Sequence, residues 1–131
     1  MGLETDRKKL RRRKLVYLAS PYSHRLRSVR RRRFEDVCRV AGGLVDDGLI
    51  VFCPIAQSHP IAEHSNVEAI DWDVWMDVDL TILARCTHLY VVMMDGWKES
   101  RGVTAEISFA KEHNIPITYL TTDGVILNVK N

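Results

Sequence analysis

The sequence predicts a single α/β domain built on a doubly wound parallel sheet. Short apolar runs alternate along the chain with amphipathic stretches of helical period, the pattern typical of βαβ units. Its 131 residues are 46% hydrophobic and 27% charged, which allows one adequate core. No apolar run approaches the roughly 18 residues that cross a bilayer. We therefore expect a cytoplasmic protein with no membrane partner.

The first 14 residues differ in composition from the rest. They hold seven Lys/Arg against two acids, a net charge of +5, whereas the other 117 hold 12 Lys/Arg and 15 Asp/Glu, a net of −3. We expect residues 1–14 to form a basic, disordered tail and residues 15–131 to form the domain. Such tails sometimes bind nucleic acid, but the acidic body makes that partner unlikely here.

The first half of the domain contains two predicted strands and one helix. Residues 15–20 form an apolar run, and residues 28–47 follow as an amphipathic helix that Gly48 ends. A second apolar run covers residues 49–53 and stops at a proline. Residues 54–67 contain prolines, serines and an asparagine, so we predict a loop there.

The second half repeats the alternation, which predicts a flavodoxin- or Rossmann-like parallel sheet of four to five strands. Ligands of such sheets bind at the carboxyl ends of the strands. Neither GxGxxG nor GxxxxGK[ST] is present, which argues against classical dinucleotide and P-loop sites. The expected elements are helices over 67–84 and 102–114, strands over 88–94 and 115–120, a polar loop over 95–101, and an edge strand over 125–129.

Glu106 falls in the centre of the apolar face of the helix predicted over 102–114. Burying an unpaired carboxylate costs several kcal/mol, roughly, so this placement requires a partner or a function. An ionised carboxylate near a helix N-terminus suits nucleophilic attack at a sugar anomeric carbon. The alternative is a glutamate that only caps the helix.

Asp79 is the second carboxylate on an apolar face, among the tryptophans and leucines of the helix over 67–84. Burial would raise its pKa, which suits a group that shares or gives a proton. Alternatively, Asp79 is a buried cap or the ion-pair partner of Arg85 or Arg101. Two carboxylates in different environments are typical of divided acid and nucleophile roles.

Three motifs resemble the nucleoside 2-deoxyribosyltransferase and nucleotide N-glycosidase superfamily, over about residues 14–121. Residues 16–22, VYLASPY, are similar to the V-Y-[LF]-[AC]-G-P start of that family. Asp79-Leu80 is similar to its Asp-Leu pair before the central strand. The third motif, Ser100-x-Gly102-x-x-x-Glu106, is similar to its [DS]-x-G-x-x-x-E.

The resemblance implies an enzyme that cleaves or transfers an N-glycosidic bond without a cofactor. Glu106 would attack C1′ of a (deoxy)ribosyl group and form a covalent intermediate. Tyr17 would orient that carboxylate, although a tyrosine that merely fills the strand is the alternative. Asp79 would bind a sugar hydroxyl or manage the proton of the leaving base. A non-catalytic nucleotide-binding or sensing domain of the same fold is the alternative function.

Ser100 bears on substrate choice, because family members with Asp there tend to act on nucleosides and those with Ser on 5′-monophosphates. A serine hydroxyl beside a helix N-terminus can donate to a phosphate. Cationic contacts from Arg25, Arg27 or Arg101 would add to it, unless these arginines are plain surface charge. The other residues that we assign to the substrate site are Ser20, Tyr22, His59, Trp97 and Gly102.

Several features depart from the family pattern or stand outside it. Ser20 replaces the usual glycine, and Trp97 makes its loop bulkier, as a base-stacking platform or an interface cover. His59 and His64 have no standard metal-ligand spacing, so we expect no metal. Three widely spaced cysteines are expected to be reduced core residues. The family often completes its site from a neighbouring subunit, so a homo-oligomer is implied.

Overall fold

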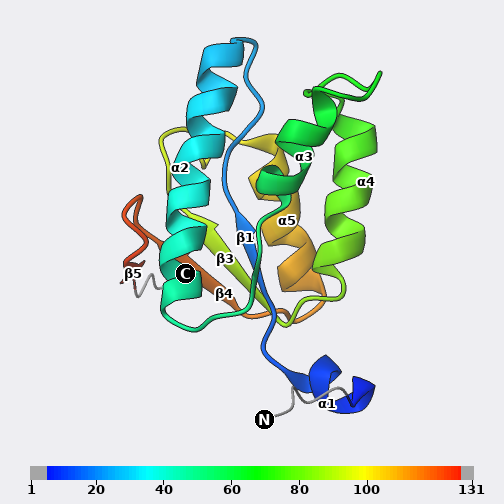
Figure 1. The fold of residues 1–131 in the computed structure, drawn as a ribbon, viewed down its shortest axis with the longest axis vertical. Helices are drawn as coiled ribbons and strands as arrows, with labels where there is room; N and C mark the ends of the chain where they lie inside the picture. The colour runs from blue at the N-terminus through cyan, green and yellow to red at the C-terminus, as the bar shows by residue number, and fades with distance from the viewer. Residues whose placement is uncertain (1–5, 128–131) are drawn as a thin grey trace.

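The computed structural model describes residues 6–127 and has three layers around one sheet (Figure 1). Helices α2 and α3 lie in front of strand β1 in this view, and α5 lies behind it. The elements are α1 (Arg7–Arg12), β1 (Val16–Ala19), α2 (Arg27–Asp46), β2 (Val51–Phe52), α3 (Pro54–Ala62), α4 (Trp72–Leu83), β3 (His88–Val92), α5 (Arg101–Glu112), β4 (Ile117–Leu120) and β5 (Ile126–Leu127).

The strand order is β2-β1-β3-β4-β5, which confirms the predicted doubly wound α/β fold. Three strand pairings, β2–β1, β1–β3 and β3–β4, are parallel as predicted, whereas β5 pairs with β4 in the antiparallel sense. The chain runs outward from β1 to β2 and then returns across the sheet to β3. The order therefore reverses between β1 and β3, and ligands of this fold bind at the carboxyl ends beside that reversal.

Alternation along β1 divides the core into two clusters. Val16 and Leu18 pack with residues of α2 and α3, whereas Tyr17 and Ala19 pack with residues of α4 and α5. All four side chains are almost fully buried, as expected for a central parallel strand covered on both faces. Tyr17 is thereby directed toward the side of the sheet on which α5 lies.

The prediction of a loop over residues 54–67 was wrong, because the first part of this segment forms helix α3. Pro54 occupies the first turn, where its missing N–H has no helical partner to lose and its fixed φ suits a helix. Pro54 and Ile55 are buried and anchor the helix to the core. The helix predicted over 67–84 is shorter than expected, because Asp71 caps its start by accepting from the Val74 N–H.

The basic tail also differs from the expectation, since residues 7–12 form α1 rather than an irregular segment. The Asp6 side chain caps this helix by accepting from the Lys8 N–H at 2.8 Å. All of its residues are exposed, so the boundary drawn between residues 14 and 15 stays a prediction. The expected edge strand over 125–129 is observed as β5, and residues 128–129 lie outside the described part. None of the described helices is long and apolar enough to cross a membrane.

Candidate active site

A cavity of about 630 Å³, including its open mouth, lies where the carboxyl end of β1 meets α3, α4 and α5. The cavity brings together six of the residues that the sequence assigned to a site: Ser20, Tyr22, Asp79, Ser100, Gly102 and Glu106. Its remaining walls include Pro54, Ile55, Ser58, Trp72, Trp75 and Met76.

Glu106 lies on the inner face of α5 and is only 4% exposed. Its Oε2 accepts a hydrogen bond from the Tyr17 hydroxyl. Burial raises the pKa of Glu106 to about 8; the Tyr17 hydrogen bond lowers it and the nearby Asp79 charge raises it further. Ser100 caps α5, so capping does not explain why a glutamate stands at position 106.

Asp79 lies midway along α4 and also faces the cavity. Burial raises its pKa to about 7. The two arginines considered as partners are engaged elsewhere: Arg85 donates to the Thr81 carbonyl at 2.8 Å, and the Arg101 guanidinium lies 3.9 Å from the Trp72 ring centroid. Within residues 6–127, no ion pair to Asp79 is formed, so a structural salt bridge does not account for this carboxylate.

Burial also raises the pKa of Tyr17 well above its ordinary value, and the charge of Glu106 adds to that effect. Tyr17 therefore keeps its proton and acts as the donor in its hydrogen bond to Glu106. The Tyr17 ring lies 6.5 Å from that of Phe52, centroid to centroid, which fixes the side chain within the apolar cluster. The arrangement presents a carboxylate held by one donor to a cavity that contains a second carboxyl group.

Ser100 lies at the N-terminus of α5, where its Oγ accepts from the Val103 N–H at 3.2 Å. The hydroxyl proton is not used by this bond and can be donated into the cavity. Gly102 follows in the first turn and leaves the backbone there without a side chain. Free N–H groups and the helix dipole favour an anion at such a position.

Tyr22 and His59 form a pair at the edge of the cavity. The Tyr22 hydroxyl and His59 Nδ1 are 2.6 Å apart, and the His59 ring stacks on Phe34 at a centroid distance of 4.2 Å. His59 belongs to α3 rather than to a loop, and burial lowers its pKa. Tyr22 is shared with an adjoining polar hollow that His59, Arg27 and Arg30 also line.

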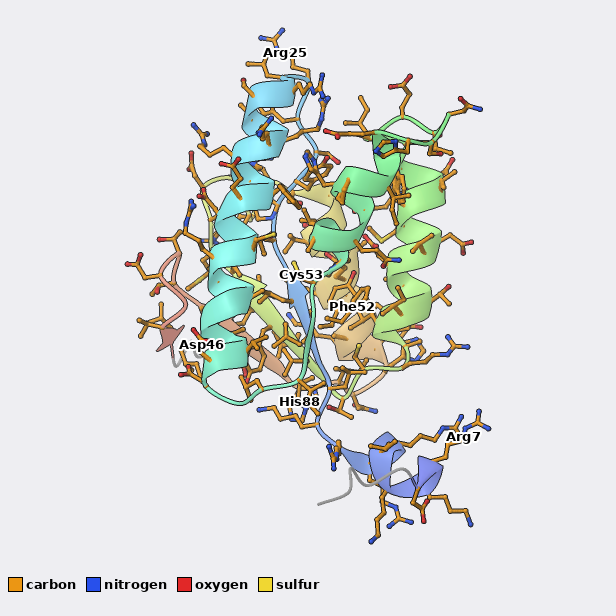
Figure 2. All side chains as sticks on the ribbon, viewed as in Figure 1. Arg7, Arg25, Asp46, Phe52, Cys53 and His88 are labelled. Atoms are coloured by element: carbon orange, nitrogen blue, oxygen red, sulfur yellow. The ribbon has the colours of Figure 1, made fainter. Side chains whose placement is uncertain are left out.

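Arg25 and Trp97 are not brought to the cavity. Arg25 is exposed and lies at the tip of the loop before α2, directed away from the sheet (Figure 2). Trp97 packs against Tyr119 at a centroid distance of 5.7 Å, with the Lys98 ammonium over its ring. Packing against the core explains the bulk of Trp97 without a ligand.

Several lining residues were missed as site residues by the sequence reasoning. Trp75 and Met76 share the helical face of Asp79, so the projection that singled out the acid also held the signal for them. Ser58 was hidden by the assignment of its segment to a loop. Among the described residues, no group of three or more His, Cys, Asp or Glu side chains could hold a metal ion. The three cysteines are free, and two of them are buried.

Residues 14–121 match the family described as Domain of unknown function (DUF1937). No curated protein matches the chain. Among solved structures, the 2-deoxyribosyltransferase of the psychrotolerant bacterium Bacillus psychrosaccharolyticus matches with a TM-score of 0.61 and 20% sequence identity, covering 87% of this chain and 77% of that one. The resemblance inferred from the sequence motifs is thus confirmed at the level of the fold. The protein belongs to the DUF1937 family and has a 2-deoxyribosyltransferase-like fold.

Proposed function

We propose that this protein cleaves the N-glycosidic bond of a nucleoside 5′-monophosphate or nucleoside, or transfers its (deoxy)ribosyl group, through a covalent glutamyl-glycosyl intermediate. The observation that carries the proposal is the buried Glu106, held by Tyr17 in a cavity that Asp79 shares. A buried carboxylate with a specific orienting donor, in a cavity at the carboxyl end of a central strand, suits nucleophilic catalysis. The named activity of the structural relative is consistent with this chemistry.

In the first step, a Glu106 carboxylate oxygen bonds to C1′ while the bond from C1′ to the base nitrogen breaks. The electron pair of that bond leaves with the base, which takes up a proton. Asp79 is suited to supply this proton, because it faces the same cavity as Glu106 and its burial favours the protonated form of the carboxyl group. Tyr17 holds the attacking carboxylate in place by donating to its other oxygen.

In the second step, an acceptor attacks C1′ of the glycosyl ester and releases Glu106 as a carboxylate. Water as the acceptor gives hydrolysis, and the nitrogen of a second base gives transfer. In either case, the proton lost by the acceptor returns to the group that protonated the first base. The chemistry requires neither a metal nor a redox cofactor, because every bond made or broken is balanced by these groups.

The 5′ substituent is proposed to lie at the N-terminus of α5. Ser100 donates its hydroxyl proton there, and the first N–H groups of α5 add a partial positive charge. A phosphate is favoured over a bare hydroxyl because no carboxylate occupies position 100. The two carboxylates of the cavity, Glu106 and Asp79, then remain for the sugar and the base.

A homo-oligomer is part of the proposal. The outer face of α4 exposes Val74 and Val78, one turn apart, and Ile70 precedes them beside the mouth of the cavity. Exposed apolar side chains at this spacing are typical of a helix that packs against another subunit. Light scattering during size exclusion would measure the mass, and a monomer at all concentrations would contradict this part of the proposal.

The decisive experiment is to incubate the protein with a panel of nucleosides and 5′-monophosphates and to measure free base by chromatography. Rapid quenching and intact mass spectrometry should then show a protein species heavier by one glycosyl group, absent in Glu106→Gln. Tight binding of a nucleotide without base release would instead indicate the non-catalytic nucleotide-binding alternative. Release without any covalent species would remove the intermediate from the mechanism.

A further inference from the structure

Ser20 stands directly after β1 and contributes a hydroxyl to the wall of the cavity. The residue is only 5% exposed. Among the residues that the structure describes, its Oγ is the one buried side-chain oxygen or nitrogen without a hydrogen-bond partner. Leaving a buried hydroxyl unpaired destabilises a protein by about 1–3 kcal/mol. An orphaned hydroxyl in a cavity wall therefore indicates a partner supplied by the ligand.

The position of Ser20 relative to the two carboxylates indicates which part of the ligand it meets. Tyr17 and Ala19 of β1 pack on the α4 and α5 side of the sheet, and the alternation places the next position on the α2 and α3 side. Glu106 and Asp79 enter the cavity from α5 and α4. Continued one residue beyond β1, this alternation directs Ser20 toward the part of the cavity wall formed by Pro54 and Ile55 of α3.

The geometry of nucleophilic displacement at C1′ relates the α5 side of the cavity to the α3 side. A nucleophile that attacks C1′ approaches from the face opposite the departing group. If Glu106 attacks from the α5 side, the leaving base extends toward the α3 side, where Ser20 lies. A hydroxyl can donate to a ring nitrogen or carbonyl oxygen and can accept from an amino group. The orphaned group therefore matches the polar edge of a nitrogen heterocycle.

Resting on the function proposed above, we propose that the Ser20 hydroxyl hydrogen-bonds the leaving base and is a specificity-determining residue of this protein. The contact is particular to this chain, because the sequence pattern that it resembles has glycine at this position and so offers no side chain. The Ser20 hydroxyl is not required for bond cleavage itself. It selects among bases by the hydrogen-bonding group that each presents to it.

The test uses the free base and the sugar phosphate as separate ligands, so that binding is measured without turnover. Isothermal titration of wild type, Ser20→Ala and Ser20→Gly with each common free base, and separately with ribose 5-phosphate, reports the two halves of the site. Loss of one neutral hydrogen bond should weaken binding of the recognised base about three- to ten-fold, with ribose 5-phosphate affinity unchanged. Ser108→Ala, on the exposed face of α5, serves as the control and should match wild type.

Thermal unfolding provides a second readout that a merely structural role would move in the opposite direction. Removing an unpartnered buried hydroxyl should leave the Tm of Ser20→Ala equal to or above that of wild type. Weaker base binding together with an undiminished Tm supports the proposal. Unchanged base affinity, weaker sugar-phosphate binding instead, or a lower Tm would overturn it. If wild type binds neither half and releases no base, the proposed function itself fails, and the inference fails with it.

Discussion

The hydroxyl of Tyr17 donates a hydrogen bond to Oε2 of Glu106 and thereby joins the first strand of the sheet to a helix 89 residues further along the chain. Both groups are buried, so neither is free to turn toward solvent. The bond favours the charged form of Glu106 against the burial that opposes it. Tyr17 thus adjusts both the direction and the protonation of the carboxylate.

Tyr17→Phe should slow the reaction and shift its pH dependence. The ring and its packing remain, but the pKa of Glu106 rises once the Tyr17 donor is removed, by about one unit for a charge-assisted bond. The acid limb of the profile of kcat/KM against pH should therefore move to higher pH. Tyr119→Phe, in the same apolar cluster but outside the cavity, is the control. An unshifted limb would show that Tyr17 only fills space.

Glu106→Gln should reduce base release by about three orders of magnitude or more, because the amide keeps the shape of the side chain but is not a nucleophile. Substrate affinity, measured by calorimetry, should change only a few-fold. The exposed Glu112→Gln, on the same helix, should behave as wild type. Activity retained within several-fold would exclude Glu106 as the nucleophile.

Asp79→Asn should fold normally but turn over about 100-fold more slowly, since a positioned proton donor contributes about that much or more. Removing its charge should also lower the pKa of Glu106, because that charge raises it. Asp77→Asn, exposed on the same helix, is the matched control. A variant that unfolds easily yet keeps full specific activity in its folded fraction would assign Asp79 a structural role.

The two raised pKa values predict that stability falls as pH increases. Glu106 and Asp79 bind protons in the folded protein up to about pH 8 and 7, but only up to about 4.5 and 3.8 when unfolded. Their stabilising contribution is therefore complete below about pH 4 and is lost as pH rises through 7 and 8, at up to about 1.4 kcal/mol per pH unit for each group. Urea unfolding between pH 5 and 9 measures this slope.

The same titration series on Glu106→Gln isolates the contribution of that carboxyl group. The neutral amide does not titrate, so the free energy of unfolding should depend less steeply on pH than in wild type. The variant should exceed wild type most clearly at pH 8 and above. Parallel curves for the two proteins would mean that Glu106 has an ordinary pKa in the folded state.

Ser100→Asp should reverse the preference for a 5′-monophosphate over its nucleoside. Aspartate is as good an N-cap as serine, so α5 should remain intact. Its negative charge would repel a phosphate and should reduce monophosphate affinity about ten-fold or more. Ser100→Asn caps the helix without charge and separates the two effects. Equal affinity of wild type for both ligands would remove Ser100 as a phosphate contact.

Much of the architecture could be predicted because it follows from periodicity. The apolar runs of β1 and β3 are buried on both faces, and the helical projections placed Glu106 and Asp79 on inner faces where the structure has them. Each of these features depends on residues close together in sequence. The spacing of apolar residues along the sequence is therefore sufficient to locate them.

Other features depend on contacts that local patterns do not encode. Helix α3 was missed because its prolines indicate a break, whereas burial of Pro54 and Ile55 against β1 and α2 stabilises the helix. Arg25 was expected to add a cationic contact to a phosphate, and Trp97 to stack on a base or cover an interface. The direction of each side chain depends on tertiary packing. Trp97 packs against Tyr119, and Arg25 is exposed to solvent.

Helix α1 lies beyond the end of the sheet at which β1 begins, whereas the cavity opens where β1 ends (Figure 1). Five of its six residues are basic and all are exposed. A negatively charged resin or electrode that binds α1 would leave the opening of the cavity directed toward the bulk solution. Immobilised in this way, the protein should exchange small molecules as freely as it does in solution.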